Sequence, residues 1–282
     1  MSFLFLVGPS VFAALFLLER RFALRRTKSP LTSRLAVNAV VSVLAIATGL
    51  LLVRPAAAAV FGIVSERDWS LAGLLSSNAI VQGLVGFALL DLTFYYWHRA
   101  NHTWALLWRF HNAHHIDPDL DVTTAVRFHF VEIGFSAAFR ALQVVLIGSP
   151  AWVFVVYEVA FQVNTLFQHS NLRLPIAVER VLVLVLVTPR MHGVHHSKRF
   201  DETNCNWSSV CSVWDRLHAT LRLDVPQASI DIGIAGYSRP DDNTVAAVLT
   251  MPFRAQRDYW HDARLGDRAA ARNTAVRTRL AE

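Results

Sequence analysis

Three short histidine boxes limit the folds open to this chain more than any other feature. In the first box two histidines are four residues apart, and in the other two a histidine is followed by others at spacings of three and four. On a helix such residues share one face, so each box is expected to aim its imidazoles at one point. The eight residues are His98, His102, His111, His114, His115, His192, His195 and His196.

Clustered imidazoles of this kind predict a metal centre. Imidazole is the commonest metal ligand in proteins, and eight rings without a metal would compete for few hydrogen-bond acceptors. A tetrahedral zinc site takes four ligands, so eight ligands fit two metal ions better than one. The boxes contain no cysteine and no HExxH motif. Iron, zinc, copper and nickel all accept imidazole, so the ligand type alone leaves the metal open.

The apolar composition indicates an integral, multi-pass membrane protein. Of the 282 residues, 54% are hydrophobic and only 17% are charged, which is a low charge content for a soluble protein. The expected fold is all-α with about four or five hydrophobic segments and a histidine-rich cap, because irregular backbone at membrane depth is costly. The apolar runs lie at residues 2–18, 35–53, 79–97, 133–147 and 151–167.

The basic residues predict the orientation of these segments. The net charge is +6, but Lys and Arg flank apolar runs instead of forming a stripe, which argues against nucleic acid as a partner. Six of them lie from Arg20 to Arg34, directly after the first run. This bias and the number of crossings predict that the segment and all histidine boxes lie on the cytoplasmic side. Arg54 and Pro55 are expected to end the second run.

Other polar residues in and around the apolar runs also carry expectations. Asp91 precedes His98 by seven residues, about two helical turns, so we interpret it as a hydrogen-bond partner of a box histidine, with helix packing as the alternative. The hairpin at 133–167 either spans the bilayer or re-enters it. Both options keep the residues before and after it on the side of the boxes. Cys205 and Cys211 are expected to be free thiols.

The boxes and the segments between them resemble the membrane fatty acid hydroxylase and sterol desaturase superfamily. His129 and Glu132 lie in RFHFVE, which is similar to the family's R-x-H-P-x-E, and His169 lies in FQHSNL, which is similar to its H-S-N segment. TPRMHGVHH and VWDRL match its closing region. The resemblance covers roughly residues 85–222.

The chain departs from the family pattern at three places. Gly193 stands where the family usually has the arginine of H-R-V-H-H. The family's N-Y-G is replaced by the segment 204–206, which reads Asn-Cys-Asn. The Phe-Gly pair of its closing W-D-x-x-F-G-T is replaced by His218 and Ala219. No departure removes a box histidine.

The resemblance implies an O2-dependent oxidoreductase that hydroxylates or desaturates a C–H bond of a lipid or sterol. It implies two iron ions held by the eight box histidines, with His169 as an additional ligand, and O2 as co-substrate. A separate redox partner (ferredoxin, cytochrome or reductase) would supply electrons. Asp91, His129 and Glu132 are the candidate catalytic residues: His129 as a ligand or a partner of one, the two carboxylates as groups that orient ligands.

Two other classes of function remain open on the residues alone. One is a non-redox membrane protein with a zinc site, and the other is a metal-dependent lipid hydrolase. We expect three stretches: transmembrane helices and a loop at 1–78, a catalytic domain with the boxes at 79–225, and a polar tail at 226–282. His218 and His261 are expected at the surface. Lining of the lipid entrance, or anchoring at the membrane interface, is the interpretation for Trp97, Trp104 and Trp108.

Overall fold

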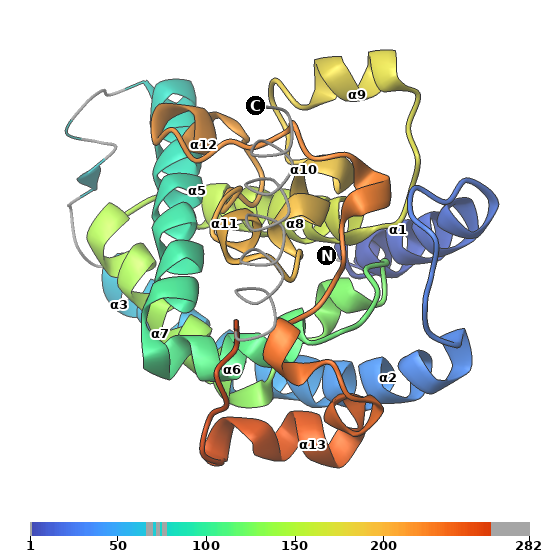
Figure 1. Cartoon of the computed structure of the whole chain (residues 1–282). Coiled ribbons are helices and arrows are strands. Elements are labelled where there is room, and N and C mark those ends of the chain that lie inside the picture. Colours follow the sequence, from blue (N-terminus) through green and yellow to red (C-terminus); the bar gives the residue numbers. More distant parts are fainter. Residues whose placement is uncertain (1, 66–69, 72–73, 75–77, 261–282) are drawn as a thin grey trace, which may run out of the picture.

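The computed structural model describes residues 2–65, 70–71, 74 and 78–260. Within these ranges the chain forms helices and loops, with three isolated β-bridges and no strand. The prediction of an all-α fold is therefore confirmed (Figure 1). His261 and the stretch 262–282, which the sequence predicts as a surface helix or disordered tail, lie outside the described residues.

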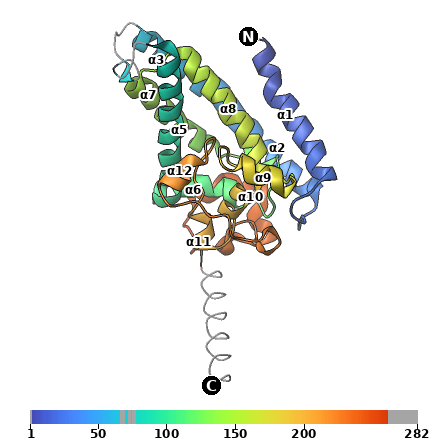
Figure 2. The same ribbon diagram turned by 90° about the horizontal axis from the view of Figure 1, so that it is seen from above.

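Long helices build the apolar bundle, and short helices build most of the cap at the end of that bundle. The long helices are α1 (Ser2–Arg21), α2 (Leu31–Thr48), α3 (Arg54–Ser65), α5 (Ala79–Thr103), α7 (Phe130–Ile147) and α8 (Ala151–His169). The short ones are α6 (Ala105–His115), α9 (Ile176–Leu182), α10 (Pro189–His195), α11 (Phe200–Thr203), α12 (Val213–Leu217) and α13 (Val245–Thr250). In Figure 2 the cap helices gather at one end of the bundle.

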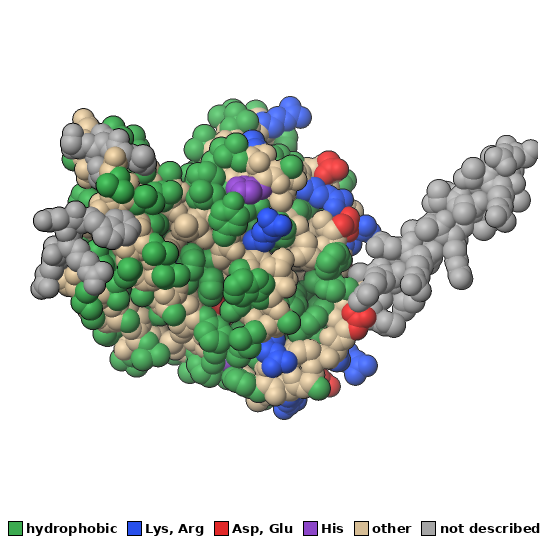
Figure 3. All heavy atoms as spheres, turned by 90° about the vertical axis from the view of Figure 1, so that its left-hand side faces the viewer, with side chains coloured by type: hydrophobic (Ala, Val, Ile, Leu, Met, Phe, Trp, Pro, Cys, Tyr) green, Lys and Arg blue, Asp and Glu red, His purple; other side chains and the backbone are tan. Residues whose placement is uncertain are grey.

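Three of the described helices are long and apolar enough to cross a membrane: Leu31–Val64, Ala79–Thr103 and Phe130–Ile147. The prediction of a helical membrane protein is confirmed, while the total of four or five segments stays a prediction. Figure 3 shows one face of the molecule, where hydrophobic side chains cover a broad area. Charged side chains gather towards one end of this face, as expected when only the cap meets water.

The second apolar run does not end at Arg54 and Pro55, so that expectation is wrong. The helix passes from α2 through a π-helical turn at Gly49–Val53 directly into α3. The π-turn shifts the hydrogen-bond register there, and proline is tolerated in the first turn of a helical segment. Residues 31–64 therefore form one long candidate span.

The hairpin of α7 and α8 reaches deep along α5. Gly148 ends α7 with a φ of 61°, a left-handed conformation that favours glycine, and Pro150 precedes α8. A Cβ on Gly86, near the start of α5, would lie 3.1 Å from the Cβ of Ser149 at the hairpin tip. Because the tip packs beside the far end of a candidate span, this geometry favours the spanning alternative.

The basic segment after α1 docks onto the cap. The backbone N–H groups of Lys28 and Ser29 donate to the Asp119 carboxylate at 2.8 and 2.9 Å. Arg34 forms buried ion pairs with Asp117 and Asp121, both at 2.8 Å. These acids follow the second histidine box, so the structure places the basic segment at the same end of the molecule as the boxes.

One core cluster contains residues from all three stretches expected along the sequence. Val37 and Val41 come from α2, Trp108 from α6, and Ile234 and Val248 from the C-terminal stretch. The stretch 226–260, which the sequence predicts as part of a polar tail, therefore also contributes buried hydrophobic side chains to the core. The cap is thus completed from both ends of the described chain.

Candidate metal centre

Each histidine box lies on a different helix. The first box occupies the last turns of α5, and the second box occupies the last turns of α6. Between them Trp104 has an extended backbone conformation (φ −94°, ψ 119°), which breaks the helix and turns α6 away from α5. The third box lies on α10, where Thr188 caps the first turn and Pro189 opens it.

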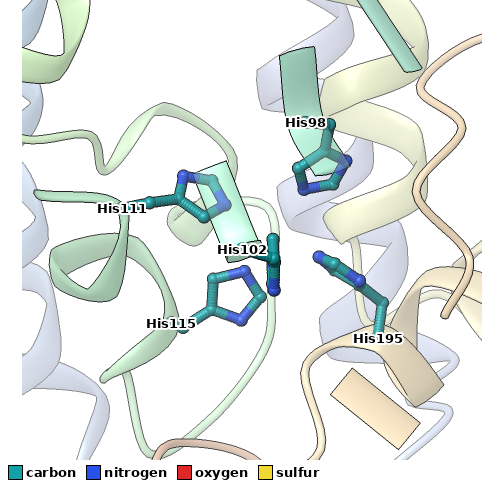
Figure 4. Close-up of side chains that lie close together, drawn as sticks. All are labelled: His98, His102, His111, His115 and His195. Atoms are coloured by element: carbon teal, nitrogen blue, oxygen red, sulfur yellow. The ribbon is translucent and has the colours of Figure 1, made fainter. Parts of the chain in front are cut away.

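Nine histidines form two groups, each with ligand atoms within 4.8 Å of one another. The five-histidine group contains His98, His102, His111, His115 and His195, and Figure 4 shows these side chains pointing towards one another. The four-histidine group contains His114, His169, His192 and His196. The groups adjoin, since the stacked rings of His115 and His196 have centroids 4.2 Å apart. All eight box residues and His169 are therefore brought together.

The boxes do not each aim at one point, so that expectation is wrong in detail. Residues four apart stay together: His111 and His115 belong to one group, His192 and His196 to the other. The residue at spacing three crosses over, because His114 joins the four-histidine group and His195 joins the five-histidine group. The physical reason is angular, since spacings of three and four lie on opposite sides of a residue by about 60° and 40°.

Backbone carbonyls fix the orientation of several rings. The Nδ1 atoms of His98 and His195 lie 2.8 Å from the carbonyl oxygens of Trp207 and Cys205, respectively. His169 Nδ1 lies 2.7 Å from its own helix carbonyl at Thr165. A neutral imidazole has a single N–H. A ring that donates from Nδ1 therefore has a lone pair on Nε2, which is available to bind a metal ion.

The four-histidine group contains close contacts between ring nitrogens that a bound cation would reconcile. The Nε2 atom of His169 lies 2.9 Å from Nε2 of His114 and 3.0 Å from Nε2 of His192. His114 Nδ1 faces the carbonyl of Arg127 at 3.3 Å, and His169 Nδ1 faces that of Thr165. Because both Nε2 atoms then carry lone pairs, direct contact would be repulsive. A bound metal ion would turn this repulsion into shared coordination.

The five-histidine group contains buried nitrogens that have no hydrogen-bond partner within the described part of the chain. These are Nε2 of His102, His111 and His195 and both ring nitrogens of His115. Unpaired buried polar atoms are costly unless a ligand engages them. Burial lowers the pKa of His195 to about 3 and also lowers the pKa of His115. Both rings are therefore neutral at physiological pH, the state in which imidazole binds metals.

Glu132 contacts a box histidine directly. Its Oε1 atom lies 2.7 Å from Nδ1 of His111, and both side chains are buried. A carboxylate in this position holds the Nδ1–H tautomer and directs Nε2 of His111 towards the five-histidine group.

His129 lies outside both histidine groups. Its Nδ1 accepts a hydrogen bond from the N–H of Val131 at 3.2 Å, so the side chain caps the start of α7. Its Nε2 lies 3.2 Å from the carbonyl of Leu249. This geometry does not support the interpretation of His129 as a ligand, because both of its ring nitrogens contact backbone groups and the side chain belongs to neither histidine group.

Asp91 makes hydrogen bonds to groups other than the box histidines. It accepts from the N–H of Cys211 at 2.9 Å, the indole N–H of Trp214 at 2.7 Å and the hydroxyl of Tyr157 at 3.4 Å. These contacts tie α5 to α8, to α12 and to the segment just before α12. The structure therefore favours the helix-packing alternative over a partnership with a histidine.

A cavity of about 110 Å³ adjoins both histidine groups. One water molecule occupies about 10–15 Å³ on the same volume scale. The cavity therefore has room for only part of a lipid molecule. Aromatic and aliphatic side chains form much of its wall, including Phe94, Trp97, Phe128, Ile133 and Phe161. Of the tryptophans considered above, Trp97 lines this cavity, Trp104 is 65% exposed, and Trp108 is buried against His102.

The structure also shows contributors that the sequence did not reveal. Asn101, Thr165 and Gln168 line the cavity, each with a buried oxygen that has no partner among the described residues. Each lies within about one helical turn of His98 or His169, and this proximity in the sequence could have predicted that they line the site. The carbonyls of Cys205 and Trp207 gave no signal, since every residue has a carbonyl. Both cysteines are free, as expected.

The fold and the site define a helical membrane protein with two adjoining histidine groups fitted to hold metal ions. Residues 83–220 match the fatty acid hydroxylase family, and this region of the chain belongs to that family. The match contains all nine histidines and falls within the predicted stretch 79–225. No solved structure matches the chain significantly.

Several characterised proteins are similar to this chain. Ornithine lipid hydroxylase OlsE of Rhizobium tropici is 34% identical over 155 residues, which cover 55% of this chain and 46% of that protein. Human alkylglycerol monooxygenase is 30% identical over 49% of this chain and 30% of its own length. Human cholesterol 25-hydroxylase is 26% identical over 48% of each. The chain thus spans less than half the length of these relatives.

Proposed function

We propose that this protein is an O2-dependent membrane oxidoreductase that hydroxylates or desaturates a C–H bond of a lipid or sterol. The observation that carries the proposal is the cavity shared by both histidine groups, because a substrate segment bound in it would lie beside both candidate metal sites. The names of the relatives support this class of activity, since all three are hydroxylases or monooxygenases of lipids or sterols.

In this proposal the nine histidines hold two iron ions. Iron would supply the capacity to bind O2 and accept electrons for attack on an unactivated carbon. Glu132 orients His111, and backbone carbonyls orient His98, His169 and His195. His129 and Asp91 support the helices that carry the site and have no direct part in the reaction.

The cavity walls determine how the substrate lies. Phe94, Phe161 and Ile133 exclude water and contact an apolar segment of the lipid. Its small volume means that only the portion carrying the reacting carbon enters, while the rest of the molecule stays in the bilayer. Orientation in a dry site is the contribution of the protein to the chemistry.

A separate electron donor and a cytoplasmic active site complete the proposal. A ferredoxin, a cytochrome or a reductase would supply electrons, and the exposed surface of the cap is where it would dock. The basic segment from Arg20 to Arg34 supports the cytoplasmic orientation, because positive residues concentrate on that side of membrane proteins.

Reconstitution with iron tests the proposal. Protein loaded with iron, a reductant, labelled O2 and a lipid extract should incorporate labelled oxygen into a lipid, or form a double bond and labelled water. His192→Ala should abolish turnover, whereas His218→Ala, at a histidine outside both groups, should retain most of it. Zinc-loaded protein should be folded and inactive, since zinc has no redox chemistry.

One outcome would replace the proposal with a non-redox function. If the protein binds two iron ions yet consumes no O2 with any lipid or electron donor, the result would favour a non-redox membrane protein with a zinc site. Release of a fatty acid without O2 would favour a hydrolase.

A further inference from the structure

A second concave site lies on the cap, apart from the histidines. It is a groove of about 680 Å³ between the end of α1, the segment 172–175 and the start of α9. The groove and the histidine cavity have no lining residue in common. The groove is therefore separate from the proposed substrate site.

The walls of the groove are apolar, and so is the surface beside it. Leu18 of α1 and Phe22, which directly follows this helix, line one side and are each 43% exposed. On the adjacent helix and the turn after it, Ile176, Val181 and Leu184 are 53%, 66% and 61% exposed. A short helix with this many exposed aliphatic side chains is suited to lie in the membrane interface. The groove is thus positioned to meet lipid.

Two guanidinium groups give the groove its charge. Arg173 and Arg190 both line it. Arg173 is exposed and has no ion pair among the described residues. Its backbone N–H donates to the carbonyl of Phe22 at 2.7 Å, which holds the main chain of segment 172–175 against the end of α1. Arg190 pairs with Glu179 at 3.6 Å between Nε and Oε2, which is too long for a hydrogen bond, and its Nε has no hydrogen-bond partner in the ranges that the structure describes. The cationic charge of the groove therefore exceeds its anionic charge by one.

We propose that this groove binds one anionic phospholipid, with the phosphate between Arg173 and Arg190 and an acyl chain along Leu18 and Phe22. Arginine is well matched to phosphate oxygens because its planar guanidinium offers several N–H donors. The apolar wall explains why the ligand is a lipid and not a free phosphate ion. This is a second lipid site, and it holds whatever reaction the histidine centre performs.

Native mass spectrometry of the full chain in detergent tests the proposal. Phosphatidylglycerol should form a one-to-one complex at lower concentration than phosphatidylcholine. Arg173→Gln should weaken phosphatidylglycerol binding about fivefold, the effect of one interfacial cation. It should weaken phosphatidylcholine binding less, because the choline cation of that lipid offsets the charge of its phosphate. Arg180→Gln is the matched control, because Arg180 is an exposed arginine of α9 that does not line the groove.

Three results would overturn the site. They are equal binding of the two lipids, an equal loss in the Arg173→Gln and Arg180→Gln variants, and displacement of the lipid by millimolar inorganic phosphate. The measurement needs no turnover, so its failure is distinguishable from failure of the proposed oxidoreductase. An unchanged gel-filtration profile of Arg173→Gln confirms that the variant is folded.

Discussion

At the scale of single residues, two backbone positions explain departures from the family pattern. Asn206 and Ala219 are the non-glycine residues with positive φ in the described chain, both at 55°. Both stand where the resembled family usually has glycine. Asparagine tolerates this conformation, and Asn206 also donates to the carbonyls of Met191 and Arg222 at 2.8 Å. Ala219 has no such compensation in its side chain.

Ala219→Gly should therefore stabilise the protein by about 1 kcal/mol, because glycine adopts the left-handed region without steric conflict. The midpoint of thermal unfolding in detergent should rise. Ala137→Gly in the middle of α7 is the control and should lower the midpoint, since glycine there only adds backbone entropy to the unfolded chain. No rise with Ala219→Gly would mean that strain at this position is absent.

Gly193 leaves room for a buried arginine beside the third box. A Cβ at this position would collide with the Arg25 guanidinium. Arg25 is held there by its hydrogen bonds to the carbonyl of Pro189 at 3.2 Å and to Gln227 Oε1 at 2.6 Å. The arginine comes from the loop after α1, so this loop supports the helix that carries His192.

Gly193→Ala should accordingly displace either Arg25 or α10 and lower metal retention. Gly134→Ala is the matched control, because a Cβ there meets nothing within 4 Å. The double variant Gly193→Ala with Arg25→Ala should lose less metal than the sum of the single effects, as for residues in contact. Metal content per chain after dialysis is the measurement, and strictly additive losses would contradict the contact.

At the scale of elements, the capping of α7 separates two interpretations of His129. Asparagine is also a good N-cap, so His129→Asn should keep both metal ions and nearly all stability. His129→Ala should lose about 1 kcal/mol of stability and still bind two metals. Metal analysis alongside thermal unfolding checks both. Loss of one metal ion from His129→Asn would restore the ligand interpretation.

The elements also show which parts of the site could be predicted. The spacing within each box placed the eight histidines on helical faces, and the segment FQHSNL pointed to His169. The division into two groups could not be predicted, because it depends on the angle between α5 and α6 set at Trp104. The continuation of α2 through Pro55 depends on a π-turn that has no local sequence signal. The choice between the two interpretations of Asp91 could not be made from the sequence, because its partners, Cys211 and Trp214, follow only from tertiary packing.

At the scale of the whole molecule, the basic segment and the cap should lie on one side of the membrane. The backbone N–H of Lys28 donates a hydrogen bond to Asp119, which follows the second box, and α11 follows the third box. Lys28→Cys and Phe200→Cys, each made with Cys205 and Cys211 replaced, should react with an impermeant thiol reagent from the same face, the cytoplasmic one. Labelling from opposite faces would contradict the fold as well as the orientation.

The crossing of ligands between the boxes has a thermodynamic consequence for metal loading. Helix α6 supplies His111 and His115 to one group and His114 to the other, and α10 divides its histidines in the same way. An ion that orders either short helix therefore pre-arranges ligands for the second ion, so the two binding equilibria are linked. Titration followed by native mass spectrometry should show mainly metal-free and two-metal chains. A large one-metal population at half saturation would indicate independent sites.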